Sequence, residues 1–201
     1  CFYVYVWLRI RPELFCLQNP VVFLFDSDFF VGFLDRPGGL VEYASAFLSP
    51  LFAYGWLGAL VVTLLAMLIC LATRQFFAAV AGVGGRVLFL VPALLILMML
   101  GQYCQPVELC LGLGVALLFA NIYARTGGRH VAVRLAVFAI ASVLVYYVAA
   151  GLYLVFACLC GLFELGVKRN LWLGALCLLC APVVPMAASV WPFDLSLSQA
   201  Y

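Results

Sequence analysis

Side chains that could do chemistry are concentrated near the start of the chain. Asp26 and Asp28 stand two residues apart among aromatic and aliphatic residues, and Arg9 and Arg11 form a pair upstream. Two carboxylates at this spacing can hold a divalent cation or act as general base to an acceptor hydroxyl. Paired arginines can bind a phosphate or pyrophosphate through charge-assisted hydrogen bonds. We therefore take Asp26 and Asp28 as candidate catalytic residues, with a divalent cation as the candidate cofactor.

Two further charged residues follow in a turn and the helix expected after it. Arg36 precedes Pro37, which restricts φ, and two glycines that relax it, and Glu42 lies in the next helical segment. The candidate substrate-binding residues are Arg9, Arg11, Arg36 and Glu42. The residue types alone favour a simpler alternative, in which the acids are helix caps or loop solubilisers and the arginines anchor a helix among lipid phosphates.

The composition places these residues in a membrane protein. Of the 201 residues 69% are hydrophobic and 9% are charged, and the mean hydropathy is +1.24. Soluble globular proteins are roughly 45–50% apolar and about 25% charged. A net charge of +2 excludes a strongly basic nucleic-acid-binding domain. At about 20 apolar residues per crossing, we expect an all-α polytopic integral membrane protein with about seven transmembrane helices and a first outer loop on the membrane surface.

The apolar runs predict where these crossings lie. After a partial first helix that ends near Ile10, they cover 51–73, 87–104, 107–124, 131–148, 151–167 and 171–190. Each must be helical, because backbone in hydrocarbon has no water to bond. We expect 1–201 to be one transmembrane domain with its outer loop at about 11–50. Because Cys1 opens directly onto an apolar run, we also expect a truncated first helix, and further sequence after Tyr201.

The distribution of basic residues predicts the orientation. Connections after the second, fourth and sixth spans are basic, whereas those near 101–106 and 147–151 contain no Lys or Arg. Since cytoplasmic loops carry excess Lys and Arg, we expect the odd-numbered loops and the C-terminus outside, in a bacterial inner (plasma) membrane. The basic connections contain Arg74 and Arg86, then Arg125, Arg129 and Arg134, then Lys168 and Arg169.

Few ionisable residues are expected deep in the bilayer. Arg134 lies within a turn of a helix end, Glu108 near a helix start, and Glu164 four residues before Lys168, a pairing that suits a helix end. Pumps and ion transporters normally need charged residues along a path, so a transporter ranks third among the functions.

The nine cysteines do not indicate a metal site. The pairs Cys158/Cys160 and Cys177/Cys180 fall inside expected helices without a nearby histidine, and we expect these thiols to behave as small apolar side chains. Only Cys16 and Cys104 lie in outer loops, where a disulfide can form.

The turn and helix at 35–52 resemble a known family. Together with Gly55-Trp56-Leu57-Gly58-Ala59, the stretch Arg36-Pro37-Gly38-Gly39-Leu40 with Glu42-Tyr43 resembles the N-terminal region of an uncharacterised bacterial multi-pass membrane family, a domain of unknown function. That resemblance covers about residues 1–75 and implies no activity. A weaker similarity links the region to C-superfamily lipid-linked-sugar glycosyltransferases, in which Asp26 or Asp28 would match the loop acid and Arg36-Pro37 the turn. Gly38 departs from that pattern, in which a second proline is expected.

Whether the protein is an enzyme stays open. The first hypothesis is a multi-pass inner-membrane, glycosyltransferase-like module that handles a polyprenyl-phosphate sugar or another lipid-linked substrate at its outer face. The alternative is a non-catalytic membrane subunit or scaffold of a larger complex, which binds other helices through apolar and small-residue faces. The expected partners are the lipid bilayer, the lipid-linked substrate and other membrane subunits, and no nucleic acid.

Overall fold

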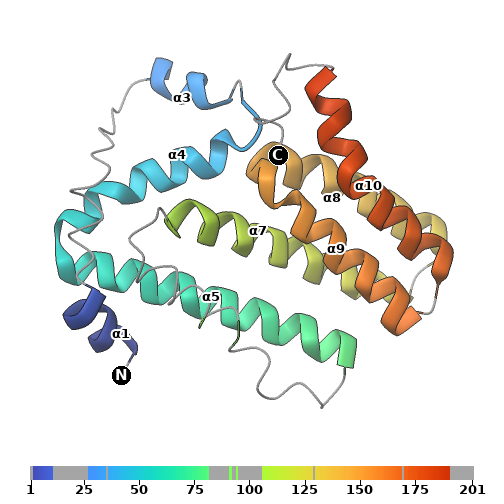
Figure 1. Cartoon of the computed structure of the whole chain (residues 1–201), viewed down its shortest axis with the longest axis horizontal. Coiled ribbons are helices and arrows are strands. Elements are labelled where there is room, and N and C mark those ends of the chain that lie inside the picture. Colours follow the sequence, from blue (N-terminus) through green and yellow to red (C-terminus); the bar gives the residue numbers. More distant parts are fainter. Residues whose placement is uncertain are drawn as a thin grey trace.

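The chain folds as a bundle of helices (Figure 1). A computed structural model describes residues 2–10, 27–34, 36–81, 91, 94, 106–128, 130–168 and 170–190. Every regular element in this part of the chain is a helix, which confirms the all-α prediction. The longer helices are α5 (Gly55–Ala81), α7 (Pro106–Arg125), α8 (Val131–Ala149), α9 (Tyr153–Phe163) and α10 (Leu171–Val190). The shorter ones are α1 (Phe2–Tyr5), α3 (Ser27–Leu34) and α4 (Gly39–Leu48), with short segments η1 (Val6–Ile10), η2 (Ser49–Ala53), η4 (Thr126–Gly128), η5 (Ala150–Leu152) and η6 (Glu164–Lys168).

Three described helical stretches are long and apolar enough to cross a membrane: Gly55–Val80, Val107–Gly128 and Val131–Val167. Large apolar side chains point outward along them, including Leu64, which is 57% exposed, and Val143, which is 68% exposed. Such a surface suits hydrocarbon, whereas soluble monomers rarely expose large contiguous apolar patches. These stretches are compatible with a membrane location and match the expected spans at 51–73, 107–124, 131–148 and 151–167.

Of the other expected spans, the one at 171–190 is described as a helix and the one at 87–104 is mostly outside the described residues. The run at 171–190 forms α10, of which Leu171–Val184 is a shorter apolar helix. The span at 87–104 lies outside the described residues apart from Val91 and Leu94. A count of about seven crossings therefore stays a prediction.

The third long stretch is a helical hairpin. The chain reverses at η5, where Ala150 has φ 5° and ψ −83°. The rings of Phe138 and Phe156 then stack with their centroids 5.8 Å apart, and those of Tyr146 and Tyr153 meet edge to face at 6.0 Å. Because these pairs close in toward the turn, α8 and α9 are antiparallel. That each of them is a separate membrane span stays a prediction.

The helices α5 and α7, by contrast, run side by side in the same direction (Figure 1). Near their ends, Asn121 Nδ2 of α7 donates a hydrogen bond of 2.9 Å to the Ala72 carbonyl of α5. Further back, Gly114 of α7 faces Leu68, whose Cδ2 would lie 3.2 Å from a Cβ at that glycine. Residue numbers rise together along both helices, so Ala81 and Pro106 lie at opposite ends of the bundle.

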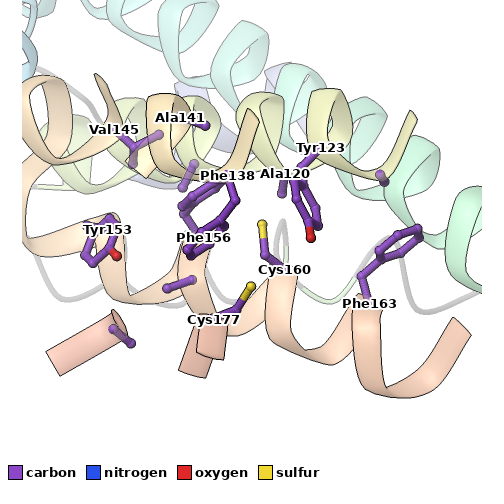
Figure 2. Packing of buried hydrophobic residues seen from close by; sticks show 14 of the residues in the cluster. Ala120, Tyr123, Phe138, Ala141, Val145, Tyr153, Phe156, Cys160, Phe163 and Cys177 are labelled. Atoms are coloured by element: carbon purple, nitrogen blue, oxygen red, sulfur yellow. The ribbon is translucent and has the colours of Figure 1, made fainter. Parts of the chain in front are cut away.

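Two apolar clusters hold the bundle together. Since lipid tails are as apolar as leucine, close packing rather than hydrophobic burial drives such contacts in a membrane. The packing between α9 and α10 is close enough that a Cβ on Gly161 would lie 2.8 Å from Leu178 Cγ. The cluster between α5, α7, α8, α9 and α10 includes Tyr123, Phe138, Val145, Phe156 and Cys160 (Figure 2), and that around α5 includes Val6, Phe52, Ala59, Ile69 and Leu117.

At one end of the bundle α4 packs against α7 and α8. It starts after Gly38, whose φ of 85° is a left-handed conformation that glycine adopts without a Cβ clash. The Gly38 N–H donates a 2.9 Å hydrogen bond to the Tyr147 carbonyl, and the Tyr147 hydroxyl donates one of the same length to the Leu34 carbonyl of α3. The helix expected after Arg36-Pro37-Gly38-Gly39 is confirmed, while its position on a membrane surface stays a prediction.

Candidate functional site

The predicted site residues fall only partly within the described chain. Asp26 and Arg11 lie outside it, and Arg9 and Asp28 belong to η1 and α3 without a described side chain. Arg36 is exposed and Glu42 is half-buried. The grouping of the two aspartates with the arginines, and the divalent cation expected there, therefore stay predictions.

Glu42 lines a cavity of about 340 Å³ between α4, α7 and η5. The other ionisable side chain in its lining is Glu108. These two acids stand in the first turns of α4 and α7, where a negative charge interacts favourably with the helix dipole. They are close enough for their charges to interact. The cavity thus has an acidic side formed by two helices that are far apart in sequence.

The remaining wall of the cavity is small and apolar. Gly112, one turn after Glu108, leaves room for Leu152 of η5, because a Cβ at this glycine would clash with the Leu152 side chain. Val41 and Leu109 also line the cavity, and Leu109 is 44% exposed on the outside of the bundle. The arrangement suits a ligand with hydrogen-bond donors at one end and apolar groups at the other.

Glu42 and Glu108 are the two side chains in the cavity lining that could ligate a metal ion. Within the described residues no group of three or more His, Cys, Asp or Glu side chains could hold a metal ion. Carboxylate oxygens accept hydrogen bonds, so Glu42 and Glu108 also suit a ligand with hydroxyl or ammonium groups.

A second polar site, which the sequence interpretation missed, lies at the other end of the bundle. Arg134 of α8 forms an ion pair with Glu164 of η6, and the Tyr123 hydroxyl of α7 donates a hydrogen bond of 2.5 Å to Glu164 Oε1. Arg134 is 4% exposed and Glu164 is fully buried. Glu164 therefore pairs with a neighbouring helix, whereas the side chain of Lys168, its expected partner, lies outside the described residues. We call Tyr123, Arg134 and Glu164 the buried ionic cluster.

Cysteines and apolar rings surround the buried ionic cluster. Figure 2 shows the side chains of Tyr123 and Cys160 turned toward one another, with Cys177 beside Cys160. Both thiols are free, and their side chains are buried in the first apolar cluster. These two are packing residues, as the sequence predicts, whereas Cys158 is exposed and Cys180 is half-buried.

Comparisons with known proteins identify a family and no activity. Neither the curated proteins nor the solved structures contain a match. A model of a family of unknown function (DUF6057) matches residues 1–201. The chain therefore belongs to this family, which confirms the resemblance to an uncharacterised membrane family and extends it beyond residue 75. Nothing in the comparisons supports the resemblance to glycosyltransferases.

Proposed function

We propose that this DUF6057 protein is a multi-pass membrane protein that binds the polar head of a lipid-linked ligand in the cavity between α4, α7 and η5. The observation that carries the proposal is the position of Glu42 and Glu108, which approach one cavity of about 340 Å³ from two helices. Carboxylates accept hydrogen bonds from sugar hydroxyls, so a sugar head suits this lining.

The surroundings of the cavity favour a lipid-linked sugar over a free one. Leu109 lines the cavity and is 44% exposed, so an apolar chain attached to the ligand can lie along the outer surface of α7. Arg36 is exposed and directly precedes Pro37 in the cavity wall. A guanidinium at this position can pair with the phosphate that joins lipid and sugar. A polyprenyl-phosphate sugar has a sugar for the two carboxylates, a phosphate for Arg36 and an apolar chain for the surface beside Leu109.

A topology of about seven crossings would place this cavity at the outer face. Because α5 and α7 are parallel, a crossing at 87–104 would return the chain to the start of α7. The connections near Gly128 and Asn170 lie at the end opposite to the cavity, and Arg125 is exposed there. Since basic residues favour the cytoplasmic side, we assign that end to the cytoplasm and the cavity to the outside of the bacterial inner membrane.

The catalytic part of the hypothesis concerns Asp26 and Asp28. If transfer of the sugar takes place on this protein, these aspartates are our candidates for the general base. Binding of the ligand is the part of the proposal that the cavity supports. The experiment below therefore measures binding rather than turnover.

The test is a titration of the full chain, in lipid nanodiscs, with a polyprenyl-phosphate hexose, followed by native mass spectrometry. Changing Glu42→Gln or Glu108→Gln keeps the side-chain volume and removes a charge. Loss of one charge-assisted hydrogen bond, about 1.4 kcal/mol, corresponds to roughly tenfold weaker binding. Arg125→Gln, at the opposite end of α7, is the control and should bind as the unchanged protein does.

Two outcomes would contradict the proposal. If the double variant Glu42→Gln/Glu108→Gln binds as tightly as the unchanged protein, the cavity is not the binding site. If the unchanged protein binds polyprenyl phosphate equally well with and without the hexose, the carboxylates do not recognise a sugar. Stable co-purification with another membrane protein, together with absence of ligand binding, would favour the scaffold alternative.

A further inference from the structure

We propose that the buried ionic cluster of Tyr123, Arg134 and Glu164 is an internal water-binding site within the helix bundle. The site lies at the opposite end from the cavity of Glu42 and Glu108, so it is independent of the proposed function. The proposal rests on the hydrogen-bonding groups of the cluster, their burial, and the helix geometry at Glu164.

The cluster uses only part of its hydrogen-bonding capacity. Arg134 pairs through Nη2 with Glu164 Oε1, which also accepts the Tyr123 hydroxyl. Within the described residues, Arg134 Nε has no hydrogen-bond acceptor, Nη2 has none besides its ion pair, and Glu164 Oε2 has no donor. The side chains of Arg134 and Glu164 are 5% and 0% exposed, so bulk solvent does not reach them. Two complementary polar atoms are thus left within one buried site.

Water is the ligand that matches both atoms. Buried polar groups in folded proteins nearly always have a partner, and an ordered water commonly supplies it. Nε needs an acceptor and Oε2 needs a donor, and one water molecule offers both. The charges of Arg134 and Glu164 already oppose each other, so a further ion would leave the site with an unbalanced charge.

The local helix geometry points to the same place. Glu164 begins the π-helical segment η6 rather than continuing α9, and its carbonyl accepts a 3.1 Å hydrogen bond from the Asn170 N–H. Turns of this kind are rare and frequently occur at functional sites. Arg134 is in the first turn of α8, which begins at Val131. Water therefore has to pass only about one helical turn, roughly 5 Å, from the connections at this end to reach the site.

Two native cysteines can report on the water. Cys160 and Cys177 are 0% and 1% exposed, and Cys177 lies close enough to Tyr123 and Arg134 to interact with both. An X-ray pulse converts a bound water molecule into hydroxyl radicals. These radicals oxidise the side chains next to that water, and thiols react readily. The matched control is Cys110, which is also buried, at 6% exposed, but belongs to the apolar cluster around α5.

The experiment is radiolytic footprinting of the full chain in nanodiscs, with oxidation of each cysteine measured by mass spectrometry. We expect Cys160 and Cys177 to be oxidised several-fold faster than Cys110. In the double variant Arg134→Leu/Glu164→Leu, which removes the polar groups together, oxidation of Cys160 should fall to the rate of Cys110. In Tyr123→Phe, which keeps Arg134 Nε and Glu164 Oε2, oxidation of Cys160 should persist.

The proposal is overturned if Cys160 and Cys177 in the unchanged protein react as slowly as Cys110, because the site is then dry. It is also overturned if the double variant folds and keeps the fast oxidation, because the water then binds elsewhere. If the double variant does not fold, the oxidation rates of Cys160 and Cys110 in the unchanged protein alone decide whether the site holds water.

Discussion

Removing one charge of the buried ionic cluster should destabilise the protein far more than removing both. In Glu164→Leu the guanidinium of Arg134, 4% exposed, loses its counter-charge, and the Tyr123 hydroxyl loses its acceptor. Breaking a buried ion pair from one side costs about 3–5 kcal/mol, and an orphaned hydroxyl adds about 1 kcal/mol. Replacing a buried pair by apolar side chains of similar size is commonly neutral or stabilises by about 1–4 kcal/mol.

A double-mutant cycle measures this difference directly. The four proteins are the unchanged chain, Arg134→Leu, Glu164→Leu and the double variant, each unfolded by steric trapping in bicelles, where the free energy of unfolding is obtained without leaving the bilayer. The interaction energy of the cycle should be at least about 3 kcal/mol. Arg125→Leu, which removes an exposed arginine, is the control and should change the free energy of unfolding by less than about 0.5 kcal/mol.

The coupling between Arg134 and Glu164 is refuted if the effects of the two single changes on the free energy of unfolding add up to that of the double change. Additivity would mean that Arg134 and Glu164 do not interact in the folded protein. A cost below about 1 kcal/mol for each single variant would refute it as well, because an exposed ion pair contributes that little.

Three other changes test the packing of the bundle. Gly161→Ala should lower the free energy of unfolding by about 1–3 kcal/mol, because the new Cβ would lie 2.8 Å from Leu178 Cγ, and the melting temperature in detergent would show it. Asn121→Leu should cost about 1–3 kcal/mol in the same assay, since the amide donates to carbonyls of both α5 and α7. Gly38→Ala should lower the free energy of unfolding by about 1–3 kcal/mol, because of the left-handed backbone alone, and should speed proteolysis near α4. An unchanged melting temperature in any of the three variants would contradict the contact or backbone conformation on which that prediction rests.

Hydropathy predicted the helices well and their ends less well. The apolar run at 51–73 ends at Arg74, yet α5 continues to Ala81. Arg and Gln are good helix formers, so a helix continues past the apolar run that made it recognisable. The boundary between α8 and α9 was easier to predict, because Gly151 and the loss of large side chains mark the reversal at Ala150.

The candidate site was harder to predict because it is made by tertiary packing. Glu42 and Glu108 belong to helices separated by the whole of α5, and no pattern in either helix indicates that they face one cavity. The buried ionic cluster did leave a signal. Arg134 and Glu164 are equally far along the chain from Ala149, so a hairpin that turns there brings them level. The sequence predicts a connection near 147–151, but Glu164 was considered only within its own helix, so this equal spacing was not used to pair Glu164 with Arg134.

The hairpin of α8 and α9 also bears on how the chain enters the membrane. If α8 and α9 cross the membrane and insert separately, Arg134 and Glu164 each enter it without the partner that they have in the closed hairpin, and an unpaired charge in a bilayer is costly. Arg134 and Glu164 lie one turn inside the same end of the two helices and neutralise each other when the hairpin is closed. Insertion of the two helices as one unit would therefore spare the bilayer both charges, with the short turn at η5 holding the helices together.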